Sequence, residues 1–465
     1  MTPRQPPRIH LIVEASARQV PIPARHTECP GKMSGKGLIM SSTLTTSIFG
    51  DSPARDLVCR GCGTRFPLAA QHACFECFGP LEVGYDEAAL ASVTREQIER
   101  GPKNIWRYAG LLPAGADPAS RVTLDPGFTP LVRADNLAAA IGLRAPLHVK
   151  DDSANPTHSF KDRVVSVALT AARALGFERY ACASTGNLAN SVAAHAARAG
   201  TPSVVFIPFD LEAGKVVTTA VYGGDLVAVE GSYDDVNRLC SELTETDEFE
   251  KTAFVNVNVR PFYAEGSKTL GFEVAEQLGW RIPEQVVIPM ASGELLTKVD
   301  KAFSELVEAG LVEPPASGWK VFGAQSAGCN PIAVALHGDT DVITPVRPTG
   351  IAKSLNIGDP AAGLYALEAV RRTGGWMDYA DDDEIRDAIR LLARTTGVFA
   401  ETAGGVTVAV LQKLIDAGRL DPDAETVVFN TGEGLKTLDA VAEQVGPTYR
   451  VRPSLRAVRE AGLLD

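Results

Sequence analysis

Between about residue 125 and residue 430, short runs of β-branched and aromatic residues alternate with amphipathic, alanine-rich segments. Short apolar runs bounded by turn residues are typical of buried strands, whereas apolar positions recurring about every three to four residues are typical of helices. The pattern predicts strands at residues 179–184, 203–208, 226–230, 253–258, 285–290, 320–324 and 426–430. It predicts helices at residues 162–175, 188–198, 233–245, 267–278, 296–309, 383–395 and 406–417. This alternation is typical of βαβ units, so we expect an α/β fold with mostly parallel sheets and ligands at the carboxyl ends of the strands.

The rest of the chain divides by composition. Residues 1–55 are rich in Pro, Arg and Ser without a sustained period, which predicts a disordered tail. A basic targeting peptide is one alternative, and a true start at Met33 or Met40 is another. We assign residues 56–86 to a small cysteine-bearing segment, 87–124 to a connecting segment, 125–455 to the core and 456–465 to a C-terminal tail.

Composition and charge exclude several classes of protein. Of the 465 residues, 45% are apolar and 22% are charged, which is ordinary for a globular chain. The net charge of −12 repels a polyanion, and the lysines and arginines are scattered, so we expect no nucleic-acid partner. No stretch approaches the ~18 apolar residues of a membrane helix, and the N-terminal apolar run is too short for a secretory signal. We therefore expect a cytoplasmic protein with no membrane partner.

Four of the eight cysteines form two C-x-x-C pairs, Cys59 with Cys62 and Cys74 with Cys77. In a reducing compartment such a doubled pair favours a metal site over a disulfide framework. The spacing predicts one structural Zn²⁺ held by four thiolates in a zinc-ribbon-like segment. The alternatives are four reduced, unmetallated cysteines and a nucleic-acid module, and the scarcity of cations around the pairs argues against the latter.

Lys161 lies at a loop-to-helix junction, within the sequence N-P-T-H-S-F-K-D-R of residues 155–163. A lysine that is partly desolvated at a pocket mouth has a lowered pKa and is a usable amine nucleophile. Taken alone, an exposed lysine beside Asp162 is the simpler interpretation. Two further loops combine a strand end with small residues and a helix start, and such loops can hold an anion on backbone N–H groups. They are S-T-G-N at residues 184–187, for which an ordinary βα turn is the alternative, and A-S-G-E-L at 291–295. T-G-E-G at residues 431–434 follows another strand, and its two glycines permit close approach of the backbone.

Seven motifs in this order resemble one known family. They are G-F-T-P-L at residues 127–131, N-P-T-H-S-F-K-D-R-V at 155–164, A-S-T-G-N-L-A-N-S at 183–191, E-G-S-K-T-L-G-F-E-V at 265–274, A-K-S-L-N-I-G-D-P-A at 352–361, E-T-A-G-G-V at 401–406 and T-G-E-G-L-K-T at 431–437. The chain resembles the tryptophan-synthase-β-like, fold-type-II pyridoxal-phosphate enzymes, and within them the threonine synthases, over about residues 58–455. The resemblance implies a catalytic core of two α/β subdomains behind the ribbon-like segment.

The resemblance also implies an activity: the γ-elimination of phosphate from O-phospho-L-homoserine, followed by addition of water at the β-carbon to give L-threonine. The cofactor is pyridoxal phosphate, held covalently by Lys161, which also serves as the acid and base. Small-molecule amino acids are the expected substrates, and a homo-oligomer, a dimer, is the expected assembly.

Further site residues follow from the resemblance. Asn187 would contact the 3′-oxygen of the cofactor and Thr431 its pyridine nitrogen. The substrate carboxylate would bind the loop of Ser184, Thr185 and Gly186. The cofactor phosphate would bind the loop of Ala291, Ser292, Gly293, Glu294 and Leu295.

The second phosphate, on the substrate, requires cationic partners. Arg260 and Lys268 are the candidates, and His158 is a weaker one. A surface ion pair is the alternative for Arg260, and a neutral loop histidine for His158. Glu294 is an unusual neighbour for a bound phosphate, so we expect its side chain to point out to solvent, with only its N–H facing the phosphate.

Two other functions compete with this one. Another fold-type-II lyase or β-replacing enzyme, of the cysteate synthase or threonine dehydratase type, shares the fold, and a dehydratase has no leaving phosphate to bind. A cofactor-free binding protein could also keep the fold, but Lys161, Asn187 and Thr431 are all present.

Overall fold

A computed structural model describes residues 48–184, 186–211 and 213–463. These residues belong to one of the two units into which the chain divides, Thr46–Asp465. Most of the N-terminal segment predicted to be a disordered tail lies outside the described residues.

Three sheets organise the structure. The N-terminal sheet is antiparallel, in the order β2-β1-β3, and consists of β1 (Ala54–Cys59), β2 (Arg65–Phe66) and β3 (Leu81–Tyr85). The small sheet is parallel, in the order β8-β7-β6-β9, and consists of β6 (Arg179–Ala183), β7 (Ser203–Pro208), β8 (Asp225–Val229) and β9 (Thr252–Phe254). The large sheet, in the order β12-β11-β10-β13-β5-β4, consists of β4 (Leu131–Arg133), β5 (Leu147–Asp151), β10 (Gln285–Pro289), β11 (Lys320–Ser326), β12 (Met377–Ala380) and β13 (Thr426–Asn430). It is parallel except for β4, which runs antiparallel to β5.

Helices fill the connections between these strands. The α-helices are α1 (Glu87–Ala91), α2 (Arg95–Glu99), α3 (Asp135–Ile141), α4 (Lys161–Ala174), α5 (Asn187–Ala199), α6 (Ala213–Ala220), α7 (Tyr233–Leu243), α8 (Arg260–Glu265), α9 (Lys268–Gln277), α10 (Glu294–Glu308), α11 (Pro331–His337), α12 (Gly363–Thr373), α13 (Asp382–Thr396), α14 (Thr402–Asp416) and α15 (Leu455–Glu460). Short 3-10 helices are η1 (Ile105–Leu111), η2 (Pro118–Ser120), η3 (Asp152–Ala154), η4 (Asp247–Phe249), η5 (Lys353–Leu355) and η6 (Gly434–Ala440).

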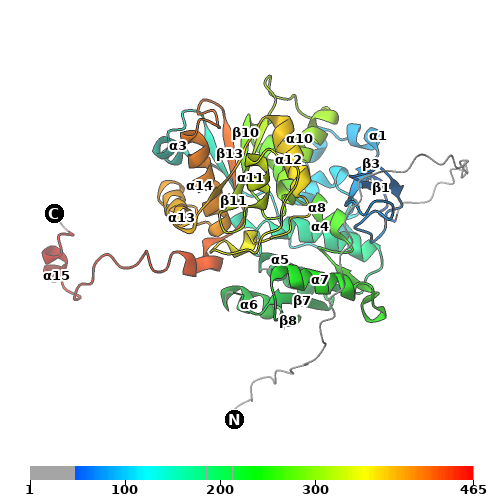
Figure 1. Ribbon diagram of the computed structural model, residues 1–465, viewed down its shortest axis with the longest axis horizontal. Helices are drawn as coiled ribbons and strands as arrows, with labels where there is room; N and C mark the ends of the chain where they lie inside the picture. The colour runs from blue at the N-terminus through cyan, green and yellow to red at the C-terminus, as the bar shows by residue number, and fades with distance from the viewer. Residues whose placement is uncertain (1–47, 185, 212, 464–465) are drawn as a thin grey trace, which may run out of the picture. The chain divides into compact units, whose positions relative to one another are not determined.

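The large sheet is covered on both faces. In Figure 1, α3, α13 and α14 lie on one side of it, and α10 and α12 lie on the other. Alternate residues of β10 pack on opposite faces of the sheet. Val286 and Ile288 belong to the core with α10 and α12, whereas Val287 belongs to the core with α14. Every residue of β10 is buried, as expected for a parallel strand covered on both faces. We call this sheet and its helices the large lobe.

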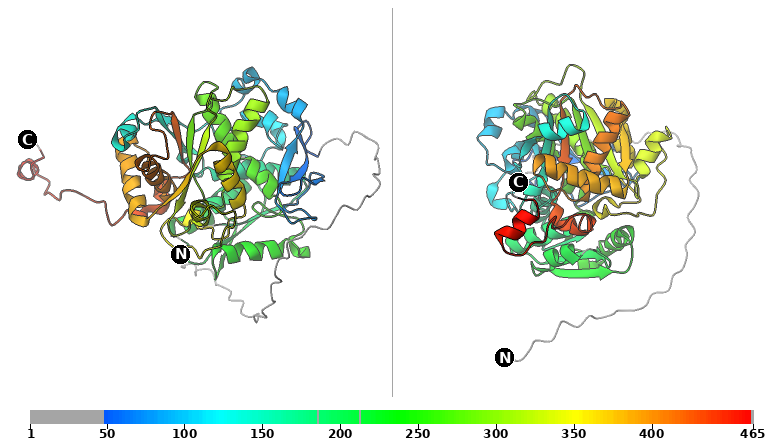
Figure 2. Two further views of the ribbon diagram at one scale, coloured as in Figure 1. Left: turned by 45° about the horizontal axis from the view of Figure 1, so that its top comes forward. Right: turned by 90° about the vertical axis from the view of Figure 1, so that its left-hand side faces the viewer.

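The small sheet also has helices packed on both of its faces. Helices α4 and α5 contribute to the core on one of its faces, and α7 contributes to the other. Figure 2 shows this small lobe, in green, beside the large lobe. The predicted α/β fold with mostly parallel sheets is confirmed, and each strand and helix predicted from the pattern is present within a few residues.

Strands β4, β5 and β12 were missed by the sequence pattern. The reason is clearest for β5, whose sequence L-H-V-K-D carries three polar residues although it lies next to β13 in the sheet. Lys150 is completely buried there. A charged residue in a strand core is possible only when partners in the folded chain neutralise it, and a local pattern does not show those partners.

Those partners form a buried group of four charges: Lys150, Asp152, Arg163 and Glu273, all with fully buried side chains. The Arg163 guanidinium donates to Asp152 at 2.6 and 2.8 Å and to Glu273 at 2.5 and 2.8 Å. Lys150 Nζ donates to Glu273 at 2.7 Å. Two positive and two negative charges cancel, and Arg163 and Lys150 together lower the pKa of Glu273 to about 2 although burial alone would raise it.

We predict that Arg163→Met lowers the free energy of unfolding by about 3–5 kcal/mol, because the two carboxylates then keep only Lys150 as a buried counter-charge. Urea unfolding measures this loss. The matched control is Arg144→Met, which breaks the exposed pair with Asp423 and should change stability little, because solvent screens that pair. Equal losses in the two variants would contradict a special role of the buried group.

Candidate active site

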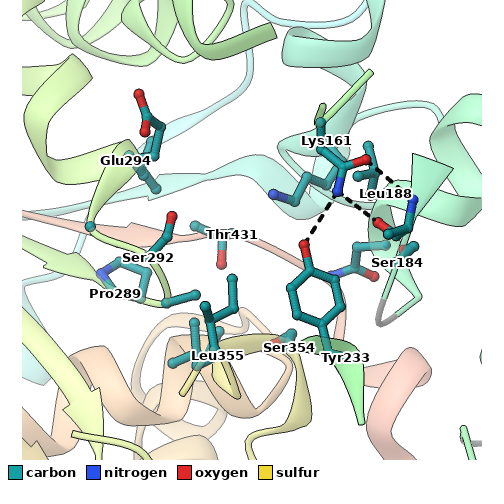
Figure 3. A pocket seen from close by; sticks show the side chains of 18 of the residues that line it. Lys161, Ser184, Leu188, Tyr233, Pro289, Ser292, Glu294, Ser354, Leu355 and Thr431 are labelled. Carbon is teal, nitrogen blue, oxygen red and sulfur yellow. Dashed lines mark hydrogen bonds between the residues drawn. The ribbon is translucent and has the colours of Figure 1, made fainter. Parts of the chain in front are cut away.

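A pocket lies between the two lobes at the carboxyl ends of their strands. Its walls include Ser184 after β6, Ser292 after β10 and Thr431 after β13, with Lys161 at the start of α4. Figure 3 shows these four side chains around a common space. This is the position expected for a ligand in an open α/β sheet.

The loop before Lys161 is tied to the loop after β13. The backbone N–H of Phe160 donates to the carbonyl of Thr431 at 3.0 Å, and Ser159 forms a bridge with Gly432. On the other side, the Asp162 carboxylate accepts from the Thr157 backbone N–H at 2.6 Å and from its hydroxyl at 2.7 Å. Asp162 thus closes the turn that precedes α4. Together these contacts fix the position of the lysine between the two lobes.

The amine of Lys161 is suited to nucleophilic chemistry. Its Nζ donates to the hydroxyl of Tyr263 at 2.8 Å. Desolvation by the surrounding protein lowers the pKa of Lys161 to about 8, although the nearby carboxylate of Glu401 acts to raise it. A substantial fraction of the amine is therefore neutral near physiological pH, as a nucleophile or general base requires.

The loop after β10 forms an anion cradle. Gly293 caps α10 with a φ of 88°, and a Cβ there would lie 2.9 Å from the Ala366 Cβ and 3.1 Å from the Ala362 carbonyl oxygen. The backbone N–H of Ala362 donates to the Ser292 carbonyl at 3.2 Å, so the start of α12 supports this loop. The loop and the N-terminus of the 15-residue helix α10 can bind a phosphate with their N–H groups.

Glu294 points away from this cradle, but not out to solvent as the sequence predicted, because its side chain lines the pocket and is 20% exposed. Figure 3 shows its carboxylate directed away from Ser292 and Thr431. The carboxylate instead pairs with Arg260 at 3.4 Å, and both residues line the pocket. The pocket therefore has a cation, Arg260, in addition to the helix N-terminus of the cradle.

Asn187 connects the two lobes at the pocket. It is the first residue of α5 in the small lobe, and its Nδ2 donates to both carboxylate oxygens of Glu401, at 3.0 and 2.9 Å. Glu401 caps α14 of the large lobe and is 1% exposed. Sequence reasoning did not assign roles to Glu401 or Tyr263, although Glu401 opens the E-T-A-G-G-V motif and could have been noticed for that reason.

The structure brings most of the residues expected at the site into one pocket. Its lining includes Lys161, Ser184, Asn187, Arg260, Ala291, Ser292, Gly293, Glu294, Leu295 and Thr431. Gly186 lies beside it as the residue before α5, and Thr185 lies outside the described residues. His158 is exposed, with a φ of 62°, and does not belong to the lining.

Lys268 is not part of the pocket lining. Its Nζ is fully buried and pairs with Glu265 at 2.7 Å and with Glu305 at 2.8 Å. A lysine already neutralised by two buried carboxylates has no free charge for a substrate phosphate. The expectation that Lys268 contacts the substrate therefore does not agree with where the structure places it.

The four ribbon cysteines converge outside the pocket. Their sulfur atoms all lie within 4.8 Å of one another, with 3.4 Å between Cys59 and Cys77 and 3.7 Å between Cys62 and Cys74. Zinc–sulfur bonds of about 2.3 Å in a tetrahedron require sulfur separations of about 3.8 Å. Backbone N–H groups of Gly61 and Glu76 each donate to a cysteine sulfur at 3.3 Å. The donor set and its spacing fit a zinc ion.

Two parallel-sheet lobes with a lysine and an anion cradle between them define the class of fold-type-II pyridoxal-phosphate enzymes. Residues 122–432 match the family described as pyridoxal-phosphate dependent enzyme. The chain is 36% identical to threonine synthase of Methanocaldococcus jannaschii over 385 residues, which covers 82% of this chain and 93% of that protein. It is 35% identical to threonine synthase of Methanosarcina acetivorans over 412 residues, which covers 87% and 98%. The chain belongs to the pyridoxal-phosphate-dependent enzymes and, within them, to the threonine synthase family.

Solved structures support the fold. Threonine deaminase isoform 2 from Solanum lycopersicum superposes with a TM-score of 0.55 at 21% identity, covering 69% of this chain and 88% of that one. A fungal L-serine ammonia-lyase from Rhizomucor miehei superposes with a TM-score of 0.55 at 19% identity, covering 68% and 98%. In the part of the chain that the structure describes, no helix is long and apolar enough to cross a membrane.

The pocket fits pyridoxal phosphate. Lys161 supplies an amine of lowered pKa, and the loop at Gly293 leads into the N-terminus of α10, whose N–H groups suit a phosphate. Asn187 and Thr431 add a buried amide and a buried hydroxyl on the walls between them. These are the amine, the anion site and the polar contacts that the cofactor needs.

Proposed function

We propose that this protein converts O-phospho-L-homoserine and water to L-threonine and phosphate. The observation that carries the proposal is Arg260, a second cationic site in the pocket that holds Lys161 and the cradle. A substrate with its own phosphate needs such a site, and relatives named threonine synthase support L-threonine as the product. Glu294 pairs with Arg260 in the structure. A substrate phosphate is more highly charged than this carboxylate, so it would compete with Glu294 for the guanidinium.

The cofactor would be held by residues already described. Lys161 would hold it covalently, the N–H groups at Ser292 and Gly293 would bind its phosphate, and Asn187 and Thr431 would contact its ring. When bound, pyridoxal phosphate supplies an electron sink that stabilises negative charge at the substrate Cα. Thr431 would offer the ring nitrogen a hydroxyl rather than a carboxylate, so this residue would give it no negative partner.

Lys161 then has a second task as acid and base. Its amine, with a pKa of about 8, can take the proton from the substrate Cα and return one at a neighbouring carbon. The Tyr263 hydroxyl, 2.8 Å from Nζ, orients the amine. Arg260 would stabilise the leaving phosphate as its charge develops.

Ser184 would contact the substrate carboxylate. Its Oγ accepts from the backbone N–H groups of Gly186 at 3.0 Å and Ala189 at 2.8 Å, so its acceptor capacity is used in capping α5. The hydroxyl proton remains available as a donor. A substrate carboxylate accepts such a donor, and the N-terminus of α5 favours the same charge.

The assay that tests the proposal measures phosphate release from O-phospho-L-homoserine together with L-threonine formation. We expect both products in equal amounts, and we expect Lys161→Ala to reduce turnover by roughly a thousandfold or more. The variant should also lose the visible absorbance of lysine-bound cofactor while its thermal unfolding is unchanged. Formation of 2-oxobutanoate from L-threonine without phosphate release would instead indicate a dehydratase.

The contribution of Arg260 is a separate prediction. Arg260→Ala should reduce kcat/KM for O-phospho-L-homoserine, because one charge-assisted contact to the leaving phosphate is lost. The loss corresponds to about 2–4 kcal/mol of transition-state stabilisation. Equilibrium binding of pyridoxal phosphate should stay unchanged. Arg133→Ala, at an exposed pair with Asp135, is the control and should match the wild type. Unchanged kinetics in Arg260→Ala would show that another group binds the phosphate.

We also propose that Cys59, Cys62, Cys74 and Cys77 hold one structural Zn²⁺. Four thiolates leave no open position on the metal, so its role would be to stabilise the segment. Gly79 supports the proposal, because a Cβ there would lie 3.0 Å from the Cys59 sulfur and 3.2 Å from the Cys77 sulfur. The cytoplasmic location and the homodimer remain predictions from sequence.

We predict about one zinc per chain in protein purified without chelator, because the four thiolates form a complete tetrahedral ligand set. Elemental analysis measures this ratio. Cys62→Ser should lower it well below one and reduce the melting temperature, whereas Cys240→Ala, a cysteine of α7 outside the cluster, should leave the ratio unchanged. Wild-type protein that contains little zinc and is equally stable after chelation would contradict the site.

A further inference from the structure

Lys436 lies behind the pocket, in helix η6 of the large lobe. Its Nζ donates to the Oδ1 atoms of Asn187 and Asn190, both at 3.1 Å. These two asparagines are three residues apart on α5 of the small lobe, so they lie on one face of that helix. Burial lowers the pKa of Lys436 to about 8, and the amine is still mostly protonated at neutral pH.

The side-chain amide of Asn187 is held from two sides. Glu401 can only accept hydrogen bonds and meets the Nδ2 of Asn187, whereas the ammonium of Lys436 can only donate and meets its Oδ1. In the flipped orientation the amide oxygen would face a carboxylate and the amide nitrogen would face an ammonium, and both contacts would be repulsive. The pair therefore selects one orientation of the amide.

That orientation directs the amide donors toward the carboxylate of Glu401. Asn187 and Glu401 both line the pocket, but Lys436 is not part of its lining. The amide nitrogen thus lies on the side of Glu401, a pocket residue, and the amide oxygen on the side of Lys436. An oxygen substituent on a cofactor ring needs a donor, so only this orientation can serve it.

Lys436 and Glu401, which both bind the Asn187 amide, lie on two segments that are hydrogen-bonded to each other. Residues Ala400 and Glu433 form a bridge, the Gly434 N–H donates to the Phe399 carbonyl at 2.9 Å, and the Glu401 N–H donates to the Gly432 carbonyl at 3.0 Å. Both partners of the Asn187 amide therefore belong to one hydrogen-bonded part of the large lobe. The amide itself belongs to the small lobe.

We propose that Lys436 is a positioning residue that holds the Asn187 amide ready for the 3′-oxygen of pyridoxal phosphate. This inference rests on the proposed role of Asn187 in binding the cofactor. Lys436 acts through Asn187 and does not contact the cofactor.

The test is titration of cofactor-free protein with pyridoxal phosphate, read by absorbance. Lys436→Met keeps most of the side-chain volume and removes the donor. We expect it to raise the equilibrium dissociation constant for pyridoxal phosphate about tenfold. We also expect the absorbance maximum of the bound cofactor to shift, because the ring oxygen loses its fixed donor. The melting temperature of the cofactor-free variant identifies any general loss of folding.

Asn190→Ala is the matched control. It removes the other acceptor of the same Nζ, at the same distance, and it also breaks the hydrogen bond from Asn190 to Thr219. We expect its dissociation constant for pyridoxal phosphate to stay within twofold of the wild-type value, even if its melting temperature falls. The absorbance maximum of the bound cofactor should not shift. Equal effects in Lys436→Met and Asn190→Ala would show that Lys436 only joins the lobes, and would overturn the proposal.

A double-mutant cycle completes the test. In an Asn187→Ala background, Lys436→Met should weaken cofactor binding no further, because its effect passes through the missing amide. Additive losses, or wild-type binding and spectrum in Lys436→Met alone, would overturn the proposal. If Asn187→Ala itself leaves cofactor binding unchanged, the proposed role of Asn187 fails, whereas the proposed reaction is judged separately by phosphate release.

Discussion

The buried guanidinium of Arg163 is the contact on which the site depends. It lies two residues after Lys161 and binds Asp152, after β5, and Glu273, in α9, with no exposed charge in the group. The same Glu273 accepts from the backbone N–H groups of Phe128 and Thr129, so the loop before β4 is tied to the same point. Because a buried ion group tolerates little displacement, it fixes the start of α4 and therefore the position of the lysine amine.

The pocket combines rigid pieces from both lobes. The small lobe contributes Lys161, Ser184 and Asn187 from the starts of α4 and α5 and the end of β6. The large lobe contributes the cradle before α10 and Thr431 after β13. Contacts such as Phe160 with Thr431 and Asn187 with Glu401 cross between the lobes. The site is complete only when the lobes are together.

The N-terminal sheet shares its core with the small lobe, because Leu57 and Val83 belong to the same cluster as Val165 of α4. Charge adds to this contact. Glu82 of β3 pairs with Lys298 of α10 at 2.6 Å, and Lys298 also pairs with Glu265 of α8 at 2.8 Å. Arg60, between two ribbon cysteines, stacks on Tyr365 of α12 at 3.7 Å. The ribbon therefore supports α10 and α12, the helices that hold the phosphate cradle.

The sequence by itself determined the fold class, because the alternation of short apolar runs with amphipathic segments is a local property that follows from burial in a parallel sheet. It also predicted Lys161, Asn187 and the loop at Gly293 as site residues, because these motifs are contiguous along the chain, and the structure places all three around one pocket. Tertiary structure alone decided the partners of buried charges. Lys268 looked like a phosphate ligand beside Arg260, but Glu305, 37 residues away, joins Glu265 in neutralising it. Strand β5 and the support of Asn187 by Lys436 and Glu401 were hidden for the same reason: each depends on residues far apart in sequence that meet only in the folded chain.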